Sequence, residues 1–211
     1  ICIAFYSYKD LHKLEKFMEG KPLNEQDIGR QLLQETAAYA ESSVCRRRIL
    51  LHYFGEEYDK DNCGNCDNCL HPKERIEAQQ QLVIALKAVL ALKENFRQEY
   101  VIDFIKGRGT DDIVSHHHNE LEEFGSGEDF NEKLWNPVIR QAMIAGYMKK
   151  DVENYGLLKV TPSGRRFIKS PHSFMVVMDT EFKDEYEDDD AQGAMAALDP
   201  ELYEMLVSLR K

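Results

Sequence analysis

The sequence predicts an α+β protein that is mainly α-helical, built as a helical hairpin closed by cysteines and followed by a winged-helix domain. Apolar residues recur at helical spacing through much of the chain, which indicates amphipathic helices. Two short strand patterns flank a turn at 153–156 and predict one β-hairpin. Four cysteines gather around the first helices: Cys45, Cys63, Cys66 and Cys69.

The composition suits one or two globular domains. The chain has 211 residues, 43% of them hydrophobic, and no apolar run is long enough to cross a bilayer. We therefore expect a soluble, intracellular protein without a membrane partner. The formal charge is −11, but residues 179–190 alone carry −7 of it. Such a block is typical of a solvated linker, so the net charge does not exclude a local surface that binds nucleic acid.

The cysteine pattern predicts a metal site. Cys63, Cys66 and Cys69 have two residues between neighbours, a spacing that aims several thiolates at one point, and Cys45 completes a tetrahedron. Zinc is the first interpretation. An iron–sulfur cluster is the runner-up, although residues 70–72 (LHP) replace the expected cysteine and proline. Two disulfides are a further alternative, which a chain of this length does not need. Four thiolates leave no open coordination position, so the expected zinc is structural.

The cysteines lie in a predicted helical hairpin domain at residues 21–75. Residues 1–20 predict a strand and a helix that end a larger unit, and Cys2 in that strand is interpreted as a buried small hydrophobic residue. Asn24 can cap a second helix. Cys45 lies in the first turn of a third helix, where amides and the helix dipole favour a thiolate. Metal binding would close this hairpin.

Residues 76–172 predict a winged-helix domain. Three helical patterns precede two strands around a glycine-containing turn. In this fold one helix can face a DNA groove while the hairpin, or wing, reaches the backbone. We interpret Trp135 as core and His116, His117 and His118 as a helix face rather than a metal site. The predicted helices are 82–92, 100–105 and 134–145, and the predicted strands are 147–152 and 157–161. A polar linker is expected at 72–80 and an acidic linker at 173–198.

Several segments carry a specific resemblance to a known family. Residues 45–56 (CRRRILLHYFGE) and 63–69 (CGNCDNC) resemble the zinc-binding segment of RecQ family DNA helicases. The winged-helix part is similar to the RecQ C-terminal module of that family in residues 100–107 (YVIDFIKG), 124–127 (FGSG) and 135–141 (WNPVIRQ).

The resemblance covers nearly the whole chain. Residues 1–20 resemble the tail of the second RecA-like motor lobe, and residues 199–211 resemble the start of a helicase-and-RNase-D C-terminal domain. We therefore expect both ends to be cut from a longer protein. The short wing is similar to that of bacterial-type members.

The resemblance implies a role in DNA repair, recombination and replication. Family members couple ATP hydrolysis to 3′ to 5′ unwinding, with ATP and Mg²⁺ bound by motor lobes. Residues 107–110 (GRGT) lack the lysine of a phosphate loop. The implied function is an accessory module, inert toward ATP by itself, that binds duplex, forked or junction DNA and guides strand separation.

Other properties follow from the same resemblance or stay open. The implied partners within the chain are the motor lobes and the C-terminal domain, and the implied location is the bacterial cytoplasm or nucleoid. The oligomeric state is not readable from the sequence. Two other functional classes remain: a stand-alone winged-helix transcription regulator with a structural zinc, and a protein-interaction module.

The candidates for phosphate contact lie near glycines and on the third helix of the winged helix. Lys106 and Arg108 can bind phosphate oxygens. The alternative interpretation of the same residues is a polar surface turn that does not contact DNA. Ser126 can add a hydroxyl contact. Arg140 reads equally as a surface ion pair. The acidic pairs at 111–112 and 128–129 would repel phosphate and so weaken or shift this footprint.

The wing supplies two further candidates. Tyr155 at its tip can stack on the terminal base pair and act as a wedge, since stacking is worth about 1–3 kcal/mol per base. Lys149 and Lys150 alternate faces, so at most one of them can point toward DNA. The complete candidate set for DNA contact is Lys106, Arg108, Ser126, Arg140, Lys149 and Tyr155.

Overall fold

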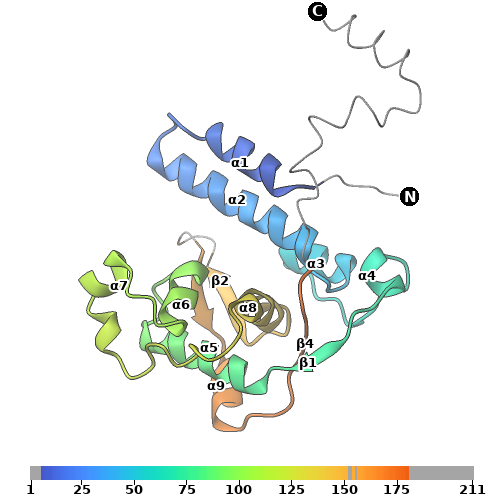
Figure 1. The fold of residues 1–211 in the computed structure, drawn as a ribbon. Helices are drawn as coiled ribbons and strands as arrows, with labels where there is room; N and C mark the ends of the chain where they lie inside the picture. Colours follow the sequence, from blue (N-terminus) through green and yellow to red (C-terminus); the bar gives the residue numbers. More distant parts are fainter. Residues whose placement is uncertain (1–5, 152–153, 155, 181–211) are drawn as a thin grey trace, which may run out of the picture.

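The structure has an N-terminal helical part and a winged helix that follows it (Figure 1). Helix α2 of the first part runs above the winged helix in this view. The computed structural model describes residues 6–151, 154 and 156–180. Cys2, Tyr155, the acidic stretch beyond 180 and the segment 199–211 lie outside the described residues.

In the N-terminal part, helices α1 and α2 lie side by side and a turn then leads into α3 (Figure 1). Ser7 caps α1 by accepting a hydrogen bond from the backbone amide of Asp10. The predicted cap Asn24 lies inside α2, because Pro22, which has no amide to satisfy, occupies the cap position. The bounds are α1 Tyr8–Lys16, α2 Leu23–Glu41, α3 Arg46–Tyr53 and α4 Asp67–Leu70.

The predicted winged helix is confirmed. Helices α5, α6 and α8 precede the antiparallel hairpin of β2 and β3. Two further helices lie outside the helical ranges predicted from the sequence: α7, which Thr110 caps by accepting from the Ile113 amide, and α9, which Thr161 caps by accepting from the Gly164 amide. The bounds are α5 Gln79–Ala91, α6 Gln98–Ile105, α7 Asp111–Ser115, η1 His118–Glu120, η2 Glu132–Leu134, α8 Trp135–Ile144, β2 Met148–Asp151, β3 Leu157–Val160 and α9 Pro162–Lys169.

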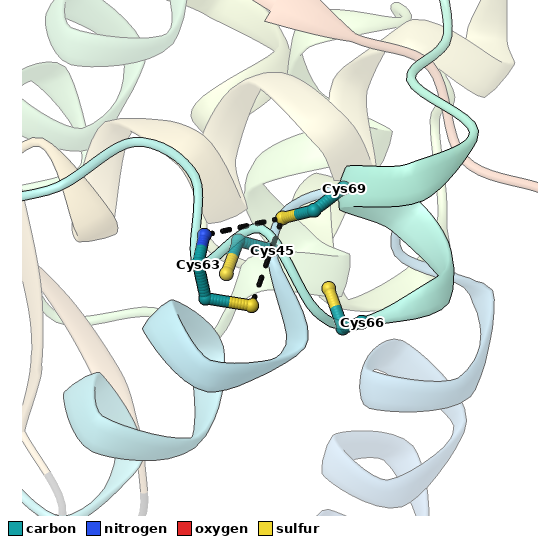
Figure 2. A group of neighbouring side chains, drawn as sticks. All are labelled: Cys45, Cys63, Cys66 and Cys69. Carbon is teal, nitrogen blue, oxygen red and sulfur yellow. Dashed lines mark hydrogen bonds between the residues drawn. The ribbon is translucent and has the colours of Figure 1, made fainter. Parts of the chain in front are cut away.

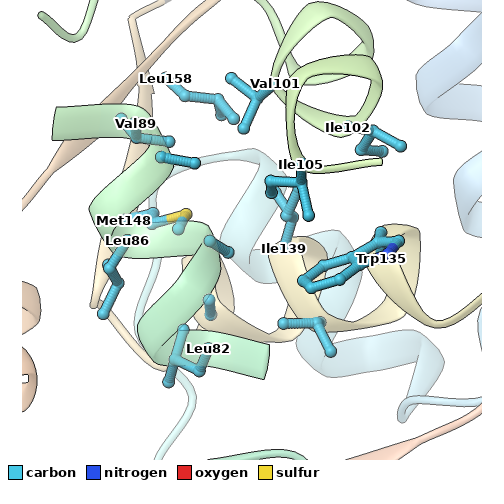
Figure 3. Close-up of a cluster of buried hydrophobic side chains, with 14 of the residues drawn as sticks. Leu82, Leu86, Val89, Val101, Ile102, Ile105, Trp135, Ile139, Met148 and Leu158 are labelled. Atoms are coloured by element: carbon cyan, nitrogen blue, oxygen red, sulfur yellow. The ribbon is translucent and has the colours of Figure 1, made fainter. Parts of the chain in front are cut away.

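The winged helix holds the main hydrophobic core, which α5, α6, α8 and the hairpin enclose (Figure 3). Trp135 is 0% exposed, as its interpretation as a core residue requires. Gly127 lies against Trp135 and Ile105 so closely that a Cβ there would overlap both side chains. Burial of one such large side chain contributes about 1.5–3 kcal/mol. The core therefore stabilises the domain independently of the cysteines.

The segments on either side of the winged helix pair with each other. Strand β1 (Arg75–Glu77) runs antiparallel to β4 (Met175–Val177). The Glu77 carboxylate accepts hydrogen bonds from the backbone amide of Phe174 and from the amides that begin α5. The expected linkers at 72–80 and 173–198 thus contain short strands in their described residues, because the buried Phe174 and Val176 draw the chain into a short ladder.

The three consecutive histidines do not share a helix face, contrary to the sequence interpretation. Helix α7 ends at Ser115, and His117 has a φ of 56°, a left-handed conformation that interrupts helices. His118 then turns back toward α6, where its Nδ1 lies 2.6 Å from the hydroxyl oxygen of Tyr100. Its ring also contacts Phe96 edge to face. His118 is therefore part of the packing between α6 and α7.

His118 is expected to make the winged helix less stable in acid. Burial, together with the charges of His116 and Lys93, lowers the pKa of His118. The unfolded chain then binds this proton more readily than the folded chain. The stability from the neutral ring is complete above the ordinary histidine pKa of about 6.5 and is lost as the pH falls through that value toward the lower folded pKa. Urea unfolding across this pH range measures the effect.

The matched variants are His118→Asn and Tyr100→Phe. His118→Asn removes the titrating ring, so this part of the pH dependence should disappear. Tyr100→Phe removes the hydrogen bond but keeps the histidine in place, so the pH dependence should persist, because burial is the main cause of the shift. An unchanged pH profile in His118→Asn would contradict the assignment.

Candidate metal centre and nucleic-acid interface

Four cysteine thiols converge beside α3 and α4 (Figure 2). Cys45 immediately precedes α3, Cys63 lies in the loop after it, Cys66 immediately precedes α4, and Cys69 lies within α4. All four Sγ atoms lie within 4.8 Å of one another, and all four cysteines are free thiols rather than disulfides. The structure therefore brings together the four residues that the sequence predicts as ligands.

The geometry of these sulfurs fits a tetrahedral zinc site. Zn–S bonds of about 2.3 Å place the sulfurs of a tetrahedron about 3.8 Å apart. The Sγ atoms of Cys63 and Cys69 lie 3.9 Å apart. Four thiolates fill the coordination sphere and leave no position for a substrate, so a bound zinc ion would cross-link the fold and perform no catalysis.

The protein environment shifts the pKa values of Cys63 and Cys69 in opposite directions. The backbone amides of Asn65 and Cys66 hydrogen-bond the Cys63 sulfur and lower the pKa of Cys63 to about 6. Burial raises the pKa of Cys69 to about 12. One thiol therefore releases its proton readily, whereas the other needs a cation to stabilise its thiolate.

Residues between and beside the cysteines fasten the site to the end of α2. The Asn68 side-chain amide donates to the carbonyl oxygens of Ser42 and Val44 at 2.7 and 2.8 Å. Arg46 binds the Asp67 carboxylate through Nε and Nη2, at 3.1 and 3.0 Å. These supporting residues were not selected from the sequence. They could have been identified because Arg46, Asp67 and Asn68 are polar residues next to metal ligands, which need such partners to fix their orientation.

Polar contacts also join α2 to the winged helix. Lys150 Nζ lies 2.8 Å from Glu35 Oε1, and these two side chains are 26% and 25% exposed. Arg97 Nη2 lies 3.7 Å from Asp27 Oδ2. The hairpin and the start of α6 are thus held against one helix of the zinc-binding part.

Both predicted cations near glycines, Lys106 and Arg108, are engaged within the protein. Lys106 Nζ donates to the carbonyl oxygens of Glu128 and Phe130 at 2.5 and 2.9 Å. Arg108 pairs with Asp103 at 2.9 Å and with Glu132 at 2.5 Å. Lys106 therefore fixes a loop, and Arg108 is shared between two acids.

The other candidates differ in accessibility. Ser126 is exposed. Arg140 pairs with Asp179 at 2.7 Å. The two side chains are only 13% and 19% exposed, so this ion pair is largely buried and does not lie on the surface. Burial raises the pKa of Asp179, which Arg140 opposes. Lys149 is exposed and Lys150 is bound to Glu35, so the two lysines do face opposite sides of the hairpin.

This combination defines a winged-helix module stabilised by a structural metal site. Residues 72–185 match the family model for the RQC domain, and residues 8–70 match the family model for RecQ zinc-binding. The chain belongs to the RQC domain family and forms a RecQ C-terminal module, in which the four cysteines are the ligands of a structural zinc ion.

The similar proteins are much longer than this chain. ATP-dependent DNA helicase RecQ from Pasteurella multocida is 29% identical over 178 residues, which cover 83% of this chain and 28% of the helicase. The protein of the same name from Haemophilus influenzae is also 29% identical, with 83% and 29% covered. ATP-dependent helicase SGS1 from Saccharomyces cerevisiae is 30% identical over 183 residues, with 79% and 13% covered. The chain thus spans less than a third of each of these relatives.

Within the part of the chain that the structure describes, no helix has both the length and the apolar character that a membrane span requires.

Proposed function

We propose that the chain is the accessory DNA-binding module of a RecQ-like 3′ to 5′ DNA helicase that acts in DNA repair, recombination and replication. The observation that carries the proposal is that matches to the RecQ zinc-binding and RQC families follow each other along residues 8–70 and 72–185. Bacterial relatives named as RecQ helicases support a bacterial cytoplasmic or nucleoid location.

In this proposal the two parts of the module divide the work. The zinc-closed hairpin is a rigid platform, and the winged helix holds duplex, forked or junction DNA beside it. ATP and Mg²⁺ act in motor lobes of a longer protein. The ion pairs of α2 with Lys150 and Arg97 support this division, because they can transmit a load on the hairpin to the platform.

The predicted contact residues take different roles in this proposal. Lys149 and Ser126 are exposed and can touch phosphate directly. Arg108 can do so by exchanging one of its two acids for a phosphate. Lys106 and Arg140 act indirectly, because their side chains hold a loop and Asp179 in place.

Tyr155→Ala is expected to weaken binding to forked DNA. In the sequence, Tyr155 lies between strands β2 and β3, and an aromatic ring at the tip of a wing can stack on the terminal base pair at a gain of about 1–3 kcal/mol. Fluorescence anisotropy with a labelled fork measures the loss. Tyr155→Phe keeps the ring and should bind like the parent. If the alanine variant also binds like the parent, Tyr155 is not a wedge.

Titration of the parent chain with forked DNA over a series of KCl concentrations tests the function itself. A DNA-binding module should lose affinity steeply as salt rises, because phosphate contacts release counterions. A preference for one duplex sequence without a preference for forks would favour a transcription regulator. Absence of salt-dependent DNA binding would favour a protein-interaction module and overturn the proposal.

A further inference from the structure

We propose that the outer face of the β2–β3 hairpin is the main phosphate-binding surface of the module, with Lys149 and Lys159 acting together as a clamp on the DNA backbone. This inference rests on the proposed DNA-binding function and identifies the surface that performs it. It also assigns Lys159, which the sequence reasoning did not select.

The strand register places the two lysines directly opposite each other. Lys149 pairs with Lys159 across the antiparallel hairpin, between the pairs Met148 with Val160 and Lys150 with Leu158. Side chains directly opposite on antiparallel strands have Cβ atoms about 4.5–5.5 Å apart, and like charges at such positions destabilise the hairpin. A folded protein that keeps this repulsion gains from an anion that neutralises both lysines.

The opposite face of the hairpin is fully occupied. Met148, Leu158 and Val160 are buried in the core, and Lys150 reaches the Glu35 carboxylate on α2. Because successive side chains alternate between faces, the hairpin cannot turn Lys150 outward without losing the core register. Lys149 and Lys159 are therefore the cations that this strand pair presents on its outer face.

Asp151, which shares the outer face, is already bound elsewhere. Its carboxylate accepts hydrogen bonds from the Asn154 side-chain amide at 2.8 Å and from the Asn154 backbone amide at 3.3 Å. These bonds, and then the charges of Lys159 and Lys149, lower the pKa of Asp151. The single negative charge of Asp151 cannot neutralise both Lys149 and Lys159, so these three side chains leave the face with a net positive charge.

The distribution of charge over the winged helix points to the same face. Residues 99–132 hold ten acidic and two basic residues, whereas residues 142–178 hold six basic and two acidic residues. Of these six cations, Lys150 pairs with Glu35 and Arg165 pairs with Glu94, which leaves four without such a pair among the described residues. The acidic half contains α7, which lies on the side of α6 remote from α8 (Figure 1), and both of its cations, Lys106 and Arg108, are engaged internally. A duplex that approaches along the hairpin and α9 avoids this repulsion.

The chemistry of the clamp suits a sugar–phosphate backbone. Two ammonium groups on flexible stems can bind one phosphate or two neighbours without reading the base sequence. The paired residues of β2 and β3 include no Arg or Asn on this face for bidentate recognition of base edges. The surface should therefore bind forks of any sequence.

Lys159→Glu in the zinc-loaded 211-residue chain tests the clamp. The variant places an acid opposite Lys149, so the thermal midpoint should stay equal or rise, whereas affinity for a labelled fork at low salt should fall at least about tenfold. The slope of log affinity against log KCl should fall by about one for each lost phosphate contact. Loss of binding together with retained or higher stability separates the clamp from a merely structural role.

Lys60→Glu is the matched control, because it makes the same charge change on an exposed loop of the zinc-binding part. It should keep the parent's salt slope. If the parent binds forks but Lys159→Glu binds equally well with the same slope, the clamp is overturned while the proposed function stands. A larger loss in Arg108→Glu than in Lys159→Glu would also overturn it. If the parent binds no fork, the proposed function itself fails.

Discussion

Replacing Cys66 by serine is expected to release the zinc ion and unfold the segment that the cysteines close. Structural zinc in small peptides contributes about 10–16 kcal/mol, which matches or exceeds the about 5–15 kcal/mol that stabilises a typical domain. No residue of α3 or α4 is buried, so this segment has little apolar packing to replace the ion. Element analysis and limited proteolysis of residues 42–70 measure the two effects.

The winged helix should survive this change because its core is separate. The buried cluster runs from Ala78 to Val176 and includes none of the cysteines. Cys2→Ser is the matched control, and it should keep the parent's zinc content. Iron with visible absorbance in the parent, or a full zinc complement in Cys66→Ser, would contradict the four-cysteine zinc site.

Replacing Trp135 by alanine is expected to be the most damaging single change in the winged helix. The side chain is 0% exposed and lies at the start of α8. Removing such a ring loses its transfer free energy and leaves a cavity, at a cost of about 3–5 kcal/mol. The midpoint of urea unfolding, followed by far-UV circular dichroism, should fall accordingly, while zinc content should stay at the parent's level.

Trp135→Phe separates packing from polarity at the same position. Trp135 Nε1 is buried and has no hydrogen-bond partner within the described part of the chain, and such an unpaired donor costs about 1–3 kcal/mol. Phenylalanine removes this donor and keeps most of the ring. The loss should therefore be clearly smaller than for alanine. Equal losses would mean that the pocket does not tolerate any change of shape.

Patterns within short stretches of the chain were predicted correctly. The four-cysteine cluster, the main helices of the winged helix and the β2–β3 hairpin follow from spacing and periodicity. Helices α7 and α9 and the pairing of β1 with β4 were missed. Elements this short have little intrinsic stability, so caps and contacts distant in sequence decide whether they form.

The histidines show why a local pattern can mislead. Residues 116–118 follow a helical stretch, yet His117 adopts a left-handed conformation and His118 bonds Tyr100 on another helix. The gain from that packing outweighs the continuation of α7 by one more turn. No periodicity in the sequence reports such a choice.

The spacing of the cysteines along the chain was enough to identify the zinc ligands, because three of the four sulfurs belong to one segment of seven residues, 63–69. Which of the candidate cations pair within the protein was decided only by the tertiary structure. Arg140 meets Asp179 and Lys150 meets Glu35, partners 39 and 115 positions away. Lys149 and Lys159 become a pair through the hairpin register. Charge acts between neighbours in space, so the sequence names the cations but the fold assigns their partners.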